Sequence, residues 1–390
     1  MTLRGEVRLR GIEAIRPLLE TRHVELADRV TAACAGTIGS RAEARDDSEA
    51  RREARTLLTV MAGERLYEPI RSGDVRALCL IREVVAAADP LADAVFALQA
   101  LGGTSIAIAG TDAQRARWLE AICGGQAMAA FAMTEPDAGS DVAAIRTSAR
   151  RDGHGWVIDG DKHLISNAGI ADIYVVFAVT TAGTGHRGLS AFLVPAETPG
   201  VVFAGPQLLA APHPLGRMRF ESCRVPSDAL LGEVDGGFRL GMMVLDTLRP
   251  TVGAAACGMA SRALVATLTH ATSRRQFGEA LASFQLIREK IGRLATELEA
   301  ARLLVYRAAW CRDTQRGRIT LEAAMAKSFA TEAAQRIVDE AVQIAGGIGV
   351  LVGHPVERLY RAVRALRIYE GTTEMQRLII ADQLLKPVDD

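Results

Sequence analysis

Apolar residues recur at helical spacing through much of the first 125 positions of this sequence. Leu57 to Leu66 carries apolar residues every three to four positions, which predicts an amphipathic helix. Arg41 to Arg55 is rich in Ala, Arg and Glu, which also favours a helix. Thr111 and Gln114 have the spacing of a capping box at a helix start, and Gly124-Gly125 marks its end. We therefore expect a helical domain over residues 1–128.

The pattern changes to short strands over residues 129–235. Apolar or alternating runs occur at Trp156 to Ile158, Ile173 to Val179 and Ser190 to Val194, and Gly, Asp and Pro separate them. Short β-branched runs between turn residues are typical of strands. This stretch is predicted to form a compact β domain.

Long helical patterns return over residues 236–390. Their alanine content and apolar stripes are typical of helices packed in a bundle. The expected helices are Phe238 to Ser273, Ser283 to Arg312, Leu321 to Ala345 and Thr372 to Leu385. The predicted fold class is mainly α with a central β domain.

Composition excludes several classes of function. Lys+Arg and Asp+Glu are equal at 46 each, and aromatic residues are 5%, so neither a basic field nor stacking platforms for nucleic acid are expected. The six cysteines have no C-x-x-C spacing, which predicts reduced, buried thiols rather than disulfides or a metal site. Ala94 to Gly110 is apolar but contains polar residues and glycines, which predicts a buried helix and turn rather than a membrane span. A cytoplasmic enzyme is the expected class.

Two motifs lie where the helical zone gives way to the β zone. Met133 to Asp141 contains Pro and Gly, which define a loop, and hydroxyls that can hydrogen-bond a planar ring or a ligand carbonyl. Gly160 to Ala168 predicts a turn that feeds a strand, with Ser166 able to donate to a buried acceptor. Taken alone, each is also explained as an ordinary turn or hairpin.

Two further motifs lie in the C-terminal helical zone. Arg274 to Gly278, followed by Phe284-Gln285, places arginine at a helix end, which suits phosphate or simply complements the helix dipole. Gln343 to Gly349 ends an apolar helical run in glycines, which allow close approach of a pyrophosphate or form a helix C-cap. The G-x-G-x-x-G spacing of a dinucleotide fingerprint is absent.

The run Ile368 to Thr372 is the most informative feature near the C-terminus. Glu370 stands between apolar neighbours and Gly371, after an arginine-rich helical segment. A carboxylate that removes a proton from carbon needs desolvation, which raises its pKa toward the working pH. Alone, such a motif is usually a solvated helix end.

Together and in this order, the motifs resemble those of the acyl-CoA dehydrogenase family of flavoproteins. The strings MTEPDAGSD, KHLISNA, RRQFG, QIAGGIG and IYEGTTEMQR carry the resemblance, which runs from about Leu101 to Leu385. It implies an N-terminal helical domain, a β-barrel-like middle domain and a C-terminal four-helix bundle, in a chain that forms a homotetramer. It also implies FAD as cofactor and an electron-transfer flavoprotein as redox partner.

The resemblance assigns Glu370 as the base that takes the pro-R α-proton of an acyl-CoA, while the β-hydrogen leaves as hydride to flavin N5. The product is a trans-2-enoyl thioester. The α-proton becomes acidic only if fixed donors stabilise charge on the thioester oxygen. In the family, the backbone N–H of the catalytic Glu and a ribityl hydroxyl do this.

The remaining site residues follow from the same resemblance. Met133 and Thr134 meet the flavin ring, and Ser166 donates near N5 and favours the reduced flavin. The pyrophosphate and adenylate contacts, some reaching across subunits, are Arg274, Phe277, Gln285, Gln343, Gly346, Gly347, Thr372 and Glu374. The positions that contact the acyl thioester and its pantetheine arm are Ser140, Asp246, Arg249 and Gly371.

Three departures from the family pattern affect this assignment. Leu164 stands where relatives often have a flavin-shielding Trp, which leaves the ring more open. Leu248 stands where some relatives place their base, which leaves Glu370 as the candidate. Ala211 to Leu215 replaces a polar stretch near the acyl and CoA entrance, and His213 within it is either a pocket residue or part of a surface turn.

Three alternatives stay open at this point. The acyl group can be carried by an acyl carrier protein in specialised metabolism, or the enzyme can be an oxidase that uses O₂. A helical scaffold without activity is the third. Acyl chain length and branching do not follow from the sequence, because one methylene changes binding by only ~1 kcal/mol.

Overall fold

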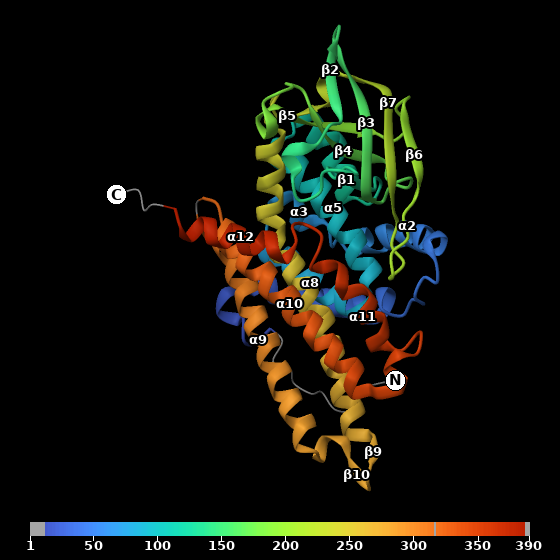
Figure 1. Ribbon diagram of the computed structural model, residues 1–390, viewed down its shortest axis with the longest axis vertical. Coiled ribbons are helices and arrows are strands. Elements are labelled where there is room, and N and C mark those ends of the chain that lie inside the picture. The colour runs from blue at the N-terminus through green and yellow to red at the C-terminus, as the bar shows by residue number, and fades with distance from the viewer. Residues whose placement is uncertain (1–11, 316, 387–390) are drawn as a thin grey trace. The chain divides into compact units, whose positions relative to one another are not determined.

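The computed structural model describes residues 12–315 and 317–386, and its elements run from helices through a sheet to helices again (Figure 1). A π-helical segment, Arg115–Leu119, joins two of the early helices. The helices before the sheet are α1 (Thr21–Ala33), α2 (Asp47–Gly63), α3 (Glu68–Ser72), α4 (Val75–Ala88), α5 (Pro90–Ala109), α6 (Asp112–Gln114) and α7 (Glu120–Cys123).

The strands form one large sheet in the order β6-β7-β3-β2-β4-β5-β8, with β1 paired to β4. Most pairs are antiparallel, while β4 pairs in parallel with β1 and β2. The strands are β1 (Ala129–Ala132), β2 (Ser148–Asp152), β3 (Gly155–Ser166), β4 (Ile173–Val179), β5 (Leu189–Pro195), β6 (Val201–Pro206), β7 (Leu215–Pro226) and β8 (Leu230–Leu231). Figure 1 shows β3, β7 and β6 side by side.

β-Branched and aromatic residues explain why the central strands form. In β4, six of the seven residues are buried, so this strand is covered on both faces. Trp156 and Phe192 meet edge to face, 5.3 Å apart, in the core beneath the sheet. This packed sheet gives the ends of β1 and β3 a rigid base.

The helices after the sheet are α8 (Gly237–Ser273), α9 (Gln285–Thr314), α10 (Thr320–Ala345), α11 (Pro355–Leu366) and α12 (Thr373–Leu384). Two short strands, β9 (Arg275–Gln276) and β10 (Glu279–Ala280), form a hairpin between α8 and α9. Alanines dominate the core of these helices, which lets them approach closely. At Gly253 a Cβ would lie 2.6 Å from Val305, so that crossing needs glycine.

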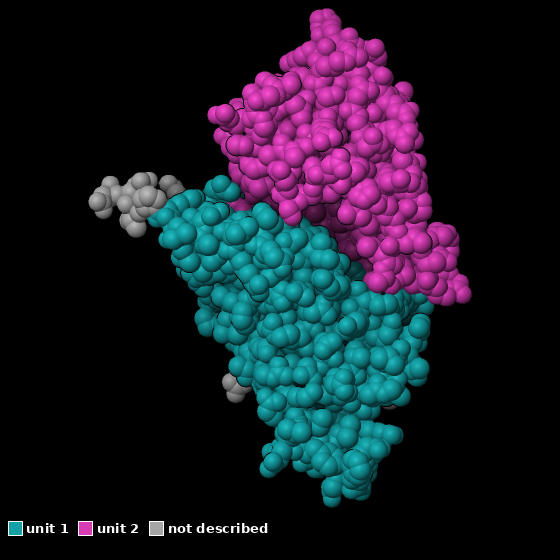
Figure 2. Space-filling model, in the orientation of Figure 1, with its two compact units in different colours: residues 1–43, 75–90, 249–390 teal, residues 44–74, 91–248 magenta. Residues whose placement is uncertain are grey.

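The chain divides into two compact units, coloured separately in Figure 2. Unit 1 contains residues 1–43, 75–90 and 249–390, and unit 2 contains residues 44–74 and 91–248. Each unit has its own buried hydrophobic cluster. The three-domain division at residues 128 and 235 stays a proposal, because a division by compactness follows different boundaries.

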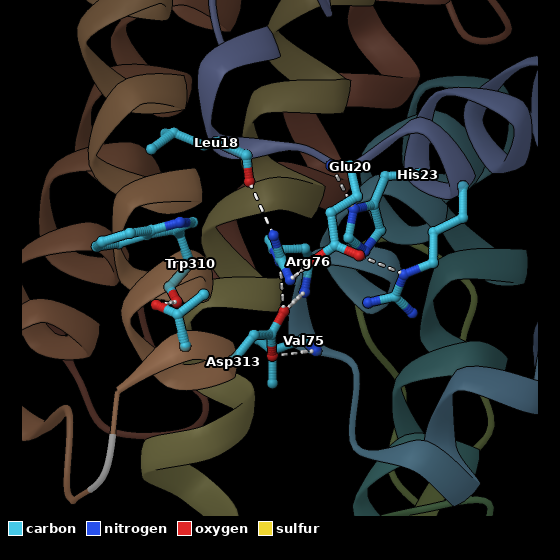
Figure 3. Close-up of polar contacts among 9 residues, drawn as sticks. Leu18, Glu20, His23, Val75, Arg76, Trp310 and Asp313 are labelled. Carbon is cyan, nitrogen blue, oxygen red and sulfur yellow. Dashed lines mark hydrogen bonds and ion pairs between the residues drawn. The ribbon is translucent and has the colours of Figure 1, made fainter.

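Ion pairs of the buried Arg76 connect the early and late parts of unit 1 (Figure 3). The guanidinium of Arg76 donates to Asp313 at 2.8 Å and to Glu20 at 2.6 Å. The same Asp313 accepts the backbone N–H groups of Val75 and Arg76. One carboxylate thus satisfies the start of α4 and fixes it to the end of α9.

The fold class predicted from the sequence is confirmed, and most elements lie where expected. The capping box of Thr111 and Gln114 is present, and the six cysteines are all buried. One local prediction was wrong: Gly160 and Asp161 are not in a turn but inside β3, at an irregularity opposite β7. The extra residue at this irregularity lies on β7, and glycine is needed at position 160 because a Cβ there would lie 2.5 Å from Thr147 Oγ1.

Two helices, α5 and α8, are long and apolar enough to cross a membrane by length and composition. Their most apolar windows are 83% and 72% buried within the protein. Core helices pass the same test, and burial accounts for their apolar surface.

Candidate functional site

The segment between α11 and α12 places Glu370 on an unusual backbone. Glu370 has φ of 55° and Gly371 has φ of 95°, so both lie in the left-handed region. For a non-glycine residue this costs on the order of 1–3 kcal/mol. Gly371 cannot be replaced easily, since a Cβ there would lie 2.5 Å from the amide nitrogen of Gln376. The backbone is therefore strained at the predicted base.

Three buried side chains hold the two carbonyl groups of this turn. Arg249 Nε donates to the carbonyl oxygen of Glu370 at 3.2 Å. Lys327 Nζ donates to that of Gly371 at 2.7 Å, and Gln376 Nε2 donates to both at 3.2 and 3.1 Å. These donors come from α8, α10 and α12, so the strain is supported from three helices of unit 1.

Glu332 of α10 anchors both ends of the same segment. It accepts from Arg367 Nε and from Thr373 Oγ1, each at 2.8 Å. Thr372 Oγ1 accepts the N–H of Met375 at 3.3 Å and so caps α12. The segment from Arg367 to Thr373 is thereby fixed as one rigid turn.

The electrostatics of the turn are those of a partly desolvated base. The Oε2 atom of Glu370 is buried. Lys327 is fully buried, and this burial lowers the pKa of its ammonium group to about 8, although the negative charge of Glu370 opposes the shift. A carboxylate on a fixed backbone, with one oxygen shielded from water, can remove a proton from a bound carbon acid.

In unit 2, a buried ion pair shapes the loop from Met133 to Ser140. Lys162 Nζ lies 2.8 Å from Glu135 Oε1 and donates to the carbonyl of Met133 at 3.1 Å. Burial lowers the pKa of Lys162 to about 8, and Lys162 holds the pKa of Glu135 low against the opposing effect of burial. The pair fixes the loop where Thr134 is half-buried and Ser140 is exposed.

Ser166 ends β3 beside an irregular backbone. Leu164 and Asn167 have φ of 54° and 62°, and Leu164 is exposed. The hydroxyl of Ser166 lies 2.7 Å from His213 Nε2. This hydroxyl and that of Thr134 are the polar side-chain groups that unit 2 offers a planar ring at the predicted positions.

The predicted phosphate contacts of unit 1 fall into separate groups. Arg274, Phe277 and Gln285 are exposed at the β9–β10 hairpin, which lies at the end of the α8–α9 pair remote from α12 (Figure 1). Gln343, Gly346 and Gly347 are exposed where α10 ends, so the predicted C-cap is present, and Glu374 is exposed in α12. The structure thus brings together Arg249, Glu370, Gly371, Thr372 and Glu374, but not the hairpin residues with them.

Asp246 is buried in the part of α8 that belongs to unit 2. Arg249, three positions later, is buried in unit 1.

The sequence reasoning missed the charged residues that support the site. Lys327 follows Ala323 by four positions and precedes Ala330 by three, so it lies on the buried alanine face of α10. A lysine on such a face is rarely left without a role. This periodicity could have identified Lys327 as a buried, functional lysine from the sequence. No comparable signal marks Gln376.

These groups fit a flavin dinucleotide in chemical type. The predicted set combines hydroxyls for a polar ring edge, an exposed guanidinium at Arg274 and open glycine backbone at Gly346 and Gly347, where an added Cβ would meet nothing within 4 Å. No cluster of metal-ligating side chains occurs in the described residues. Each of these groups is of a type that binds one part of an organic cofactor with phosphates.

Comparison with known families gives a consistent match. The model of the acyl-CoA dehydrogenase middle domain matches residues 130–223, and that of the acyl-CoA dehydrogenase C-terminal domain matches residues 235–385. The short-chain specific acyl-CoA dehydrogenase of Bos taurus is 43% identical over 71% of this chain and 68% of its own length. The 3-(aryl)acrylate reductase of Clostridium sporogenes is 39% identical over 80% of this chain and 84% of its own.

Solved structures agree in fold. Butyryl-CoA dehydrogenase from Megasphaera elsdenii has a TM-score of 0.88 at 30% identity, covering 94% of this chain and 99% of that one. A glutaryl-CoA dehydrogenase from Mycobacterium smegmatis in complex with FADH2 has a TM-score of 0.86 at 25% identity, covering 96% and 97%. The prolyl acyl carrier protein oxidase AnaB has a TM-score of 0.85 at 26% identity, covering 94% and 100%.

Proposed function

Because this chain belongs to the acyl-CoA dehydrogenase family, we propose that it converts an acyl-CoA to the trans-2-enoyl thioester, with Glu370 as the base. It is an oxidoreductase that acts on CH–CH bonds. The observation that supports the assignment of Glu370 is its strained backbone, held by Arg249, Lys327 and Gln376. Such strain persists only where surrounding contacts enforce it, and it is concentrated at functional sites.

Glu370 removes the α-proton as a carboxylate. The electron pair of the broken C–H bond becomes the new C=C bond as the β-hydrogen departs with its own electron pair. We assign the backbone N–H of Glu370 to the thioester oxygen, where it stabilises the charge that develops there. Its position is set by the carbonyl contacts of the turn, so the base and this donor are fixed together.

A bound flavin supplies the acceptor for the departing hydride, and we propose FAD. From the family resemblance, Met133, Thr134 and Ser166 would contact its ring. The residues that would contact its phosphates are Gln343, Gly346, Gly347, Thr372 and Glu374. Ser140, Asp246, Arg249 and Gly371 would contact the acyl thioester.

The exposed hairpin supports a homo-oligomer, which we propose to be a tetramer. Phe277 is 95% exposed in this hairpin, which lies at the end of the α8–α9 pair remote from α12 (Figure 1). An exposed aromatic beside a guanidinium suits contact with a neighbouring copy and its cofactor phosphates. An electron-transfer flavoprotein as acceptor, and a cytoplasmic location, remain proposals from the family.

A carrier protein is the second candidate for the acyl carrier. It is favoured by the likeness to a prolyl acyl carrier protein oxidase and by the segment Ala211 to Leu215, which lacks the polar residues of relatives. The same likeness keeps O₂ as an alternative acceptor.

Anaerobic flavin spectroscopy tests these proposals. The purified protein is titrated with acyl-CoA and acyl-carrier-protein thioesters of matched chain length, with Glu370→Gln as the control. Bleaching of the visible flavin band by one series, lost in Glu370→Gln, identifies the reaction and the carrier. Bound flavin that no thioester bleaches would refute the substrate class, and rapid reoxidation by air would favour the oxidase.

A further inference from the structure

His213 lies in the connection between β6 and β7, between two prolines, and touches the end of β3. Its Nε2 is 2.7 Å from Ser166 Oγ. The connection is held there by the N–H of Asn167, which donates to the carbonyl of Pro214 at 2.8 Å, and by the pairing of Ser166 with Leu215. The contact is therefore fixed by backbone bonds on both sides.

The imidazole of His213 is neutral under ordinary conditions. Burial and, to a smaller extent, the positive charge of Arg51 lower its pKa to about 4, while Asp47 opposes the shift. Arg51 is itself held at this place, since it donates to the carbonyls of Ala168 and Leu215 at 2.5 and 2.9 Å. A neutral imidazole has one donor nitrogen and one acceptor nitrogen.

The tautomer of His213 decides what Ser166 can offer a ligand. If Nε2 carries the proton, it donates to Ser166 Oγ, and the hydroxyl proton of Ser166 is directed elsewhere. If Nε2 is the acceptor, the hydroxyl proton of Ser166 is used up on His213, and only its lone pairs remain. A serine hydroxyl without such a partner rotates freely among its staggered positions.

We propose that His213 is a positioning residue: its Nε2–H donates to Ser166 and directs the Ser166 hydroxyl proton toward the bound flavin ring. This rests on the proposed flavin site, in which Ser166 contacts the ring. It assigns a role to a segment, Ala211 to Leu215, in which this chain departs from its relatives. His213 acts on the cofactor only through Ser166, so its influence disappears when that hydroxyl is removed.

The test is a double-mutant cycle on the midpoint potential of the bound flavin, measured in the purified holoenzyme. The variants are His213→Leu, Ser166→Ala and the two combined. His213→Gln keeps a side-chain N–H donor and is the conservative variant. His154→Leu is the control, because His154 is exposed at the opposite end of β3.

We expect His213→Leu and Ser166→Ala to change the oxidised-to-reduced equilibrium by similar factors, up to about tenfold, which is about 30 mV for a two-electron couple. The double variant adds no further change, His213→Gln restores most of the potential, and His154→Leu leaves it unchanged. A wild-type potential in His213→Leu, or an equal shift in the Ser166→Ala background, overturns the proposal. Failure of the protein to bind any flavin refutes the proposed function instead, so the two failures are distinguishable.

Discussion

Replacing Lys327 by Met separates the folding role of this residue from its role at the Glu370 turn. Met has similar length and no charge, so it fills the space without the ammonium group. The substitution removes the 2.7 Å bond to the carbonyl of Gly371, which keeps the longer bond from Gln376. The strained turn then loses one of its three supports.

Two opposing terms set the effect on stability. Burial lowers the pKa of Lys327 from 10.5 to about 8. At about 1.4 kcal/mol for each tenfold change in acidity, the buried charge costs about 3 kcal/mol at neutral pH. Loss of a hydrogen bond from a charged donor costs about 1.5–3 kcal/mol. The free energy of unfolding of Lys327→Met should therefore equal that of wild type or exceed it by up to about 1.5 kcal/mol.

The pH dependence of this difference has a definite sign. Below pH 8, Lys327 is charged in both the folded and the unfolded protein, so the cost of its burial is fully present. As the pH rises from about 8 to 10.5, only the folded protein loses the proton, and the cost disappears. Any stabilisation of Lys327→Met relative to wild type should thus be largest below pH 8 and vanish near pH 10.5.

Catalysis should respond far more than stability. A displacement of about 1 Å at a reacting group lowers a rate by about a hundredfold. We expect kcat to fall by about ten- to a hundredfold with little change in KM, and the acidic limb of the pH–rate profile to move to higher pH because a nearby positive charge is lost. The assay combines steady-state kinetics with urea unfolding, and Lys290→Met, at a surface pair with Glu340, is the control. A wild-type kcat in Lys327→Met, or a loss of kcat explained by unfolded protein, would refute the reasoning.

Two further predictions concern unit 2. Glu135→Gln leaves the buried ammonium of Lys162 without its carboxylate and should lower the free energy of unfolding by about 3–5 kcal/mol. Replacing both residues by apolar ones of similar volume should recover most of this loss. Denaturant unfolding measures both effects, and equal stability of Glu135→Gln and wild type would contradict the prediction. Thr111→Ala removes the cap on Gln114 and should cost about 1 kcal/mol in the same experiment, while Thr59→Ala, which loses only an exposed bond within α2, should cost less.

The sequence predicts local structure well where a residue acts on its near neighbours. The capping box at Thr111 and the helix end at Gly346 depend on residues within one turn, and both are present. Gly160, as a glycine beside an aspartate, favours a turn by local rules. Pairing with β7, about sixty residues away, instead places it inside a strand. Local rules fail there because the partner strand is distant in sequence.

The residues of the candidate site also differ in whether the sequence alone could predict them. Glu370 could be proposed as the base from the sequence because its motif is continuous. Lys327 could not be assigned to Gly371, since 44 positions and the packing of α10 separate them. His213 was noticed only as an unusual residue between prolines. Its contact with Ser166 depends on the register of β3 against β7, which a single sequence does not determine.

The interleaved order of the two units has a consequence for synthesis of the chain on the ribosome. Unit 2 is complete once residue 248 has been made, but α4 in unit 1 packs against α9, and Arg76 pairs with Asp313. At 5–20 residues per second, α4 waits roughly 10 to 45 s for that partner. During this interval its residues in the shared hydrophobic core, among them Val75, Cys79 and Ala86, lack their native cover from α9. The N-terminal helices are therefore the part of the nascent chain with the greatest need for a chaperone.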